Sequence, residues 1–260
     1  MFDPIHSGQV SLRRAGESLQ SLGVLPEASY DKRRLDGEAR ERLFDTGAKR
    51  VARLATEIEA HTGRRLDSCR ALDFGCGQGR LSLPLAERCQ HVYGVDVNPS
   101  ALEEAKANAT AANLTNVEWY ETKRLAELDG KYDLVLSMWV FQHIPSREGE
   151  RIFETILRGL RPGGVGHVHF TLRPSPLLSQ LFRRSGKSVR LTQSPWSYAY
   201  LLTNSYSLNR LGRLLADAGV NEWHARWHHP YPAATLIFRK PDPTADPASN
   251  GDEQSGRERS

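Results

Sequence analysis

The chain has 260 residues, of which 39% are hydrophobic and 25% are charged, a composition typical of a soluble globular protein. Its length suffices for one large domain, or for one domain with a cap. No run approaches the roughly 18 apolar residues that a membrane span needs. The N-terminus also lacks the basic and then apolar pattern of a secretory signal. These features together predict a cytoplasmic protein.

The cysteines and the charge distribution narrow the class further. Cys69, Cys76 and Cys89 form no C-x-x-C pair and no zinc-ligand spacing, which fits a reducing compartment. The net charge of +4 hides an asymmetry, because residues 241–260 hold five acids and two bases and leave +7 on the rest. That polar tail is predicted to be disordered. The basic body suggests an anionic substrate or surface, and solvated surface lysines and arginines explain it equally well.

The hydrophobic pattern predicts an α/β protein. Residues 1–65 are expected to form a helical N-terminal cap, because apolar residues recur there at helical spacing among charges. Strands and helices then alternate, which predicts a Rossmann-like, doubly wound sheet within residues 66–240. The expected strands lie at 69–74, 91–97, 116–121, 133–139 and 165–170, with two more within 221–229 and 234–239. Helices are expected at 79–88 and at 207–219. Two more are expected between these: one opens with a Ser100–Glu103 capping box, and the other has its N-cap at Ser146 and ends at LRPGG (160–164).

A glycine-rich turn follows the first predicted strand, in ALDFGCGQGRLSLPLAE at 71–87. A P-loop is excluded, because Gly79 is followed by Arg-Leu rather than by Lys and then Ser or Thr. A dinucleotide site expects G-x-G-x-x-G, whereas Gly75, Gly77 and Gly79 are spaced G-x-G-x-G. The carboxylate of Asp73 would also repel a pyrophosphate. The pattern therefore favours a ligand with an ammonium group and no phosphate, such as S-adenosylmethionine (SAM).

A second acid, Asp96, ends the second predicted strand, where a carboxylate can accept both hydroxyls of a ribose. The ordered set DFGCGQG (73–79), GVD (94–96), YDLVLSMWVFQHIP (132–145) and LRPGG resembles class I SAM-dependent methyltransferases. The resemblance covers about residues 69–170. It implies a seven-stranded sheet whose last strand is antiparallel. The QHIP variant resembles bacterial enzymes of glycan and secondary-metabolite pathways.

By position, the resemblance assigns Asp73 and Gly75 to the methionine end of SAM and Asp96 to the ribose. Many relatives carry an acid after strand three that contacts the adenine amine. No acid stands at the matching Thr122 and Lys123, so Thr122 or a backbone amide is expected to make that contact. The predicted cofactor-binding residues are Asp73, Phe74, Gly75, Cys76, Gly77, Gly79, Asp96, Val97, Thr122, Ser137 and Trp139.

Two histidines are candidate general bases for methyl transfer to a hydroxyl. His143 follows the fourth predicted strand, and the alternative is that it packs below SAM and hydrogen-bonds locally. His169, near the end of the fifth strand, is the second choice, because histidines inside strands are more often core residues. Trp139 can line the sulfonium or pack in the core. The histidines at 224, 228 and 229 lack a nearby carboxylate, so no metal site is expected.

An insertion at 171–206 is expected to form a lid that holds substrate specificity. Trp196 and Tyr200, with Tyr206, are candidates to stack on a sugar or aromatic acceptor. Tyr30 and Arg34 in the cap are candidate rim contacts. The basic, partly apolar lid suggests contact with an anionic or lipid-linked acceptor at a membrane surface. The favoured alternative is a helix folded against the cap.

The motif set also restricts the acceptor. After strand four the chain has Ser-Met-Trp-Val at 137–140, not the Asn/Asp-Pro-Pro-aromatic run of amino-group methyltransferases. It has no Pro-Cys nucleophile and no separate RNA-binding module. The sequence therefore predicts methyl transfer to an oxygen of a sugar, glycan or secondary metabolite. A SAM-binding partner subunit without turnover and, less favoured, a nicotinamide-dependent oxidoreductase are the alternatives; no oligomeric state is predicted.

Overall fold

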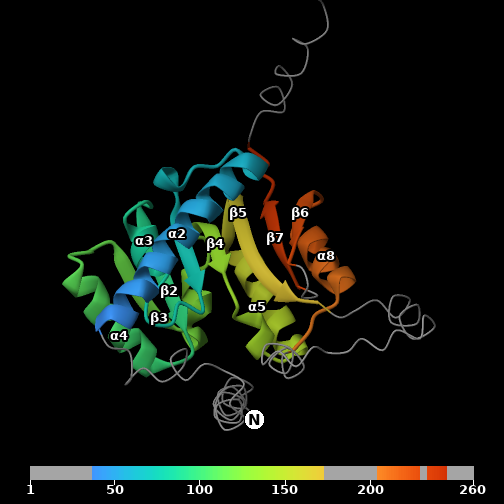
Figure 1. The fold of residues 1–260 in the computed structure, drawn as a ribbon. Coiled ribbons are helices and arrows are strands. Elements are labelled where there is room, and N and C mark those ends of the chain that lie inside the picture. Colours follow the sequence, from blue (N-terminus) through green and yellow to red (C-terminus); the bar gives the residue numbers. More distant parts are fainter. Residues whose placement is uncertain (1–36, 173–203, 229–232, 245–260) are drawn as a thin grey trace, which may run out of the picture.

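The computed structural model describes residues 37–172, 204–228 and 233–244 (Figure 1). These residues form a seven-stranded sheet of order β3-β2-β1-β4-β5-β7-β6. Strands β1 to β5 pair in parallel, whereas β7 runs antiparallel to both β5 and β6. The strands are β1 (Arg70–Phe74), β2 (His91–Asp96), β3 (Val117–Glu121), β4 (Tyr132–Ser137), β5 (Leu160–Thr171), β6 (Trp223–Trp227) and β7 (Ala233–Arg239). The predicted Rossmann-like sheet with an antiparallel last strand is confirmed.

Helices cover both faces of the sheet (Figure 1). One face carries α2 (Gly37–Thr62), α3 (Ser82–Ala86) and α4 (Pro99–Ala111), which are coloured blue to green in Figure 1. The other face carries α5 (Ser146–Gly159) and α8 (Leu208–Asp217). Three short 3-10 helices, η3 (Leu66–Ser68), η4 (Thr122–Leu128) and η5 (Phe141–His143), complete the described elements. α2, the described part of the predicted cap, packs its buried Val51, Leu54 and Ile58 directly against the sheet.

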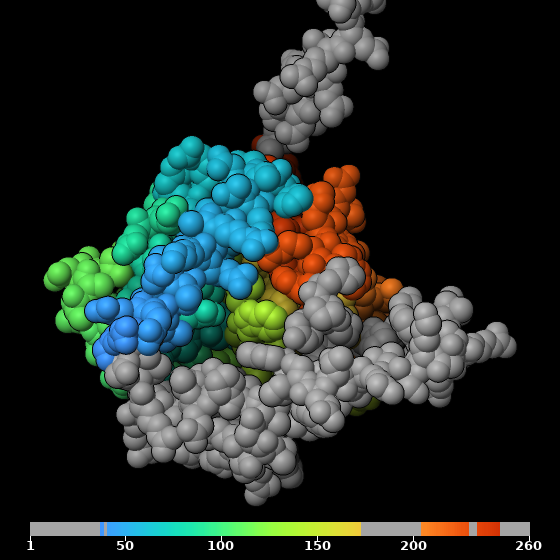
Figure 2. Space-filling model, in the orientation of Figure 1, coloured from blue at the N-terminus to red at the C-terminus, as the bar shows by residue number. Residues whose placement is uncertain are grey.

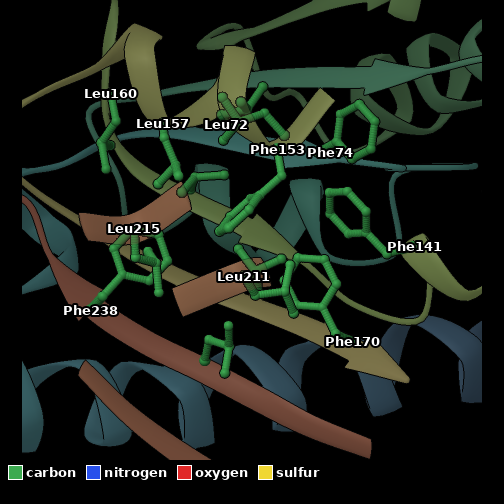
Figure 3. Close-up of a cluster of buried hydrophobic side chains, with 14 of the residues drawn as sticks. Leu72, Phe74, Phe141, Phe153, Leu157, Leu160, Phe170, Leu211, Leu215 and Phe238 are labelled. Atoms are coloured by element: carbon green, nitrogen blue, oxygen red, sulfur yellow. The ribbon is translucent and has the colours of Figure 1, made fainter. Parts of the chain in front are cut away.

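The core behind the sheet is aromatic (Figure 3). Phe141 lies between Phe170, with ring centroids 4.5 Å apart, and Phe153, at 6.1 Å. Phe153 meets Phe170 edge-on at 5.1 Å. All three rings are buried, and such pairs add to the stabilisation from apolar burial. This cluster fixes the segment after β4, on which the candidate site depends.

The starts of two helices differ from the prediction. α4 begins at Pro99, and the Asn98 side chain caps it by accepting a 3.1 Å hydrogen bond from Ser100 N. Pro suits the first helical position, because its missing N–H would lack a partner there anyway. The Ser100–Glu103 capping box is therefore wrong. The N-cap expected at Ser146 is also wrong, since α5 starts at Ser146 after Pro145.

The LRPGG segment does not sit between helix and strand as predicted, because β5 already begins at Leu160. Its pairing with β4 shifts register between Tyr132 and Leu134. Gly163 takes a φ of 72°, a left-handed conformation that glycine adopts without steric cost. The glycines thus lie in an irregular start to the strand rather than in the end of the helix, which is already complete at Gly159.

Tyr206 was expected to stack on an acceptor, and the structure contradicts this. Its side chain is fully buried, and its hydroxyl lies 3.0 Å from Phe141 O and 2.8 Å from Ile144 O. Its backbone N donates to Thr171 O at 2.8 Å. Tyr206 therefore fixes the segment after β4 from behind, and no face of its ring is open to a ligand.

Candidate active site

The glycine turn joins β1 to the segment that precedes α3. Gly75, Gly77 and Gly79 take φ values of 80°, 55° and 88°, all in the left-handed region that glycine adopts most readily. The amides of Gly75 and Cys76 both donate to Val95 O, at 2.7 and 3.1 Å. The turn is thereby folded over the end of β2, at the carboxyl edge where doubly wound sheets bind ligands.

The surroundings of two of these glycines differ sharply. A Cβ atom added to Gly75 would lie 2.9 Å from Val140 Cβ and still closer to the Val140 methyl groups. A Cβ added to Gly77 would meet no atom within 4 Å. The turn is therefore packed against the segment after β4 on one side, and its backbone is open at Gly77. A ligand can approach the main chain there.

Asp96 ends β2 beside this opening. Its Oδ2 accepts a 2.8 Å hydrogen bond from Gly77 N, and its Oδ1 accepts one of 2.8 Å from Asn98 N. The two backbone amides thus fix the orientation of the carboxylate at the end of β2.

Asp73 lies on β1 and is buried. Its Oδ2 accepts a 2.6 Å hydrogen bond from Ser82 Oγ, which ties β1 to α3. Burial raises the pKa of Asp73 to about 6, although the Ser82 hydrogen bond and the charge of Arg80 act to lower it. A carboxylate with this pKa remains mostly ionised at neutral pH, and a cation bound beside it would stabilise that form.

The other predicted cofactor residues frame the turn. Phe74 and Cys76 are buried. Ser137 is also buried and donates a 3.0 Å hydrogen bond to Phe74 O, so its hydroxyl joins β4 to β1. Val97 and Thr122 are partly exposed and follow the ends of β2 and β3. All five lie at or next to the carboxyl edge of the sheet.

His143 lies in η5, in the segment after β4. Its ring Nε2 is 3.1 Å from Nε2 of Gln142, and its backbone N donates to Val140 O at 2.9 Å. Burial lowers the pKa of His143, so the imidazole is neutral at physiological pH. Because Val140 packs on Gly75, this segment lies directly beside the glycine turn.

Trp139 and His169 contact each other, with ring centroids 4.2 Å apart. His169 is fully buried on β5, and neither ring nitrogen has a hydrogen-bond partner. Burial lowers the pKa of His169 to about 3. A group with so low a pKa is a weak proton acceptor, which favours His143 over His169 as the base.

Arg50 on α2 is a candidate site residue that the sequence analysis missed. It is half-buried, and burial and the neighbouring Arg80 and Arg53 lower its pKa. Among the described residues it makes no ion pair, and a desolvated charge without a partner is unfavourable. Gly47, one helical turn earlier, abuts the Arg80 backbone, so this face of α2 borders the glycine turn. The signal in the sequence was a cation on the core-facing stripe of the helix.

Some predicted residues cannot be placed. Tyr30, Arg34, Trp196 and Tyr200 lie outside the described residues, as do most of the predicted lid and tail. Within residues 37–172, 204–228 and 233–244, no group of three or more His, Cys, Asp or Glu side chains is placed to hold a metal ion. No helix in those ranges is both long enough and apolar enough to cross a membrane.

Comparison with known proteins identifies the central part of the chain. Residues 71–164 match the family model described as a methyltransferase domain, and this range runs from β1 to the first residues of β5. This chain carries a class I methyltransferase domain. The ubiquinone biosynthesis O-methyltransferase of Leptothrix cholodnii is 34% identical over 110 residues, which are 41% of this chain and 46% of the relative.

Two further comparisons concern magnesium-protoporphyrin methyltransferases. The magnesium-protoporphyrin O-methyltransferase of Synechocystis is 40% identical over 77 residues, covering 29% of this chain and 34% of the relative. The matches to both curated relatives span less than half of the relatives' length. The solved magnesium protoporphyrin IX methyltransferase of Synechocystis, with bound SAM, has a TM-score of 0.56 and 18% identity, and the match covers 92% of this chain and 98% of that one. At this identity the likeness shows a shared fold.

Proposed function

We propose that the methyltransferase domain binds SAM and transfers its methyl group to an oxygen atom of a small-molecule acceptor. One observation carries the proposal: the backbone opens at Gly77 while the Asp96 carboxylate is held on that same turn. An open backbone and a fixed bidentate acceptor fit a nucleoside, and the acids at Asp73 and Asp96 disfavour a pyrophosphate. The motif order and the family match support the same cofactor.

Each part of the cofactor can be assigned to a described residue of suitable chemistry. Asp96 would accept the ribose hydroxyls, and Val97 and Thr122 would border the adenine. Asp73 would face the ammonium group of the methionine end. Arg50, which makes no ion pair among the described residues, would pair with the carboxylate. This arrangement places an opposite charge beside each end of a zwitterion.

When bound, SAM would supply a methyl group on a sulfonium sulfur. The sulfur keeps the electron pair of the broken C–S bond and leaves as a neutral thioether. The protein must then hold the acceptor oxygen in line with the methyl carbon and remove its proton. His143 is the proposed base, because its lowered pKa keeps it neutral and able to accept the proton. His169 is the weaker alternative.

The acceptor class rests on several separate indications. Two relatives are named as O-methyltransferases, of ubiquinone biosynthesis and of magnesium-protoporphyrin, which supports an oxygen acceptor. A sugar, glycan or secondary metabolite remains the proposal from the sequence, and the basic body favours one with an anionic or lipid-linked group. Three free, buried cysteines support a cytoplasmic location.

Calorimetric titration with SAM, S-adenosylhomocysteine (SAH) and NADH tests the cofactor. We expect SAM and SAH to bind and NADH to fail; binding of NADH alone would refute the proposal. Arg50→Gln should weaken SAH binding at least tenfold, or about 1.4 kcal/mol, and leave 5′-methylthioadenosine, which lacks the amino-acid group, unaffected. Arg50→Lys is the charge-conserving control. Release of SAH from SAM with a panel of acceptors then separates an enzyme from a binding subunit without turnover.

A further inference from the structure

Three aromatic rings gather where β4, β5 and β6 end. The ring centroids of Trp139 and His169 are 4.2 Å apart, those of His169 and His228 are 5.2 Å apart, and those of Trp139 and His228 are 6.3 Å apart. β4 and β5 are parallel, and β6 runs with them because both β5 and β6 are antiparallel to β7. The cluster therefore lies at the carboxyl edge of the sheet, as the glycine turn does.

The backbone at Trp139 is strained. Its φ is 63°, and in the described part of the chain Asn113 is the other non-glycine residue with a positive φ. Asn tolerates the left-handed region, but a bulky side chain there costs on the order of 1–3 kcal/mol. Such strain persists where the surroundings impose it, and it concentrates at ligand sites. Here it sets the indole against His169 while 39% of Trp139 stays exposed.

The support behind the indole is polar but uncharged. His169 is buried with both ring nitrogens free of hydrogen bonds in the structure. His228 is held by its Nε2, which lies 2.8 Å from Thr235 Oγ1. Buried polar atoms normally find a partner. Because both nitrogens are enclosed, His169 supports the indole through ring contact rather than by binding a ligand directly.

The cluster borders the reacting end of the proposed cofactor site. Val140, the next residue after Trp139, packs against Gly75 of the glycine turn. In the space-filling view, yellow-green atoms reach the surface between blue α2 and orange β6 and β7 (Figure 2). Trp227 is also exposed, but it alternates along β6 with Arg226, which pairs with Glu57 of α2. Trp227 therefore faces the opposite side of the sheet.

We propose that Trp139, supported by His169 and His228, is the platform on which the methyl acceptor stacks, and that the acceptor is a planar aromatic compound bearing a hydroxyl group. This inference rests on the proposed function, and it narrows the acceptor class. An exposed indole attracts a second aromatic ring beyond simple area burial. Recognition of a sugar needs several accessible hydrogen-bonding groups around the platform, whereas the described rings against Trp139 are His169, whose nitrogens are buried, and His228, whose Nε2 lies 2.8 Å from Thr235 Oγ1.

Calorimetry with planar phenols of one to three ring systems tests the platform: catechol, 2,3-dihydroxynaphthalene and quercetin, with methyl β-glucopyranoside as the sugar. Each is titrated into the full chain with and without saturating SAH. We expect phenol binding that strengthens with ring area, and no binding of the glucoside. Trp139→Ala should weaken phenol binding about three- to tenfold, Trp139→Phe should retain most of it, and the matched control Trp227→Ala should equal the wild type.

The same variants identify what would overturn the inference. Equal phenol binding by Trp139→Ala and wild type would overturn it, as would binding of the glucoside alone or of no phenol. A loss of SAM affinity in Trp139→Ala that greatly exceeds the loss of SAH affinity would assign the indole to the sulfonium instead. Failure of the wild type to bind SAH would refute the proposed function, and the phenol titration without SAH would still decide the platform.

Discussion

Gly75 and Gly77 lie two residues apart in one turn, yet alanine at each should have opposite consequences. Gly77→Ala should destabilise the fold only modestly and weaken cofactor binding. Gly75→Ala should destabilise the protein itself. The reason is that an added Cβ at Gly77 enters open space, whereas at Gly75 it enters the side chain of Val140.

The magnitudes follow from the geometry. Both positions have a left-handed φ, which costs a non-glycine residue roughly 1–2 kcal/mol. At Gly75 the Cβ would also lie 2.9 Å from Val140 Cβ, and such overpacking adds about 1–3 kcal/mol. Gly75→Ala should therefore lose about 2–5 kcal/mol of unfolding free energy, a large part of the roughly 5–15 kcal/mol of a typical domain. Gly77→Ala should lose about 1–2 kcal/mol.

Urea denaturation of both variants gives the unfolding free energies, and SAH titration gives the affinities. Gly77→Ala should weaken SAH binding at least tenfold, which is about 1.4 kcal/mol. Wild-type SAH affinity in Gly77→Ala would refute the placement of the cofactor on this turn. Wild-type stability in Gly75→Ala would refute the packing of Val140 on the turn.

Three further substitutions test the site. Asp96→Asn should weaken SAH binding tenfold or more, because its NH2 group would oppose one of the two backbone N–H groups that now donate to the carboxylate; unchanged affinity by calorimetry would contradict the ribose assignment. His143→Ala should keep SAH affinity and lose turnover, and since its pKa is lowered, the wild-type kcat should fall with decreasing pH only below 6.5; full turnover in the variant would make His143 structural. For His169, the folded pKa of about 3 lies below the unfolded value of 6.5, so the unfolded state binds more protons and stability falls as pH drops from 6.5 toward 3. His169→Phe should remove up to about 1.4 kcal/mol per pH unit of that slope; parallel stability curves in urea would show that His169 does not titrate as inferred.

Local patterns determined the order of elements and the cofactor end of the site. Glycine spacing, the acid near the end of the first strand and the acid that ends the second are local sequence signals, and the structure places Gly77 and Asp96 in hydrogen-bond contact. The start of α4 was predicted wrongly, because Asn98, Pro99 and Ser100 are all residues that favour a helix start and the structure uses Asn98 as the N-cap. The burial of Tyr206 could not be predicted, since its two carbonyl partners lie more than 60 residues away in the chain.

The sequence by itself determined that a SAM-type turn ends the first strand of a doubly wound sheet, because periodicity and short-range spacing encode those features. Only the tertiary structure decided which charges and rings meet at that edge. The pKa of Arg50 is lowered by burial and by the charges of Arg80 and Arg53, and His169 is a weak base because burial removes its solvent. Trp139 lies against His169 and His228, which are far from it in the sequence. These pKa shifts and ring contacts depend on burial and on contacts between residues far apart in the sequence, which local sequence patterns do not encode.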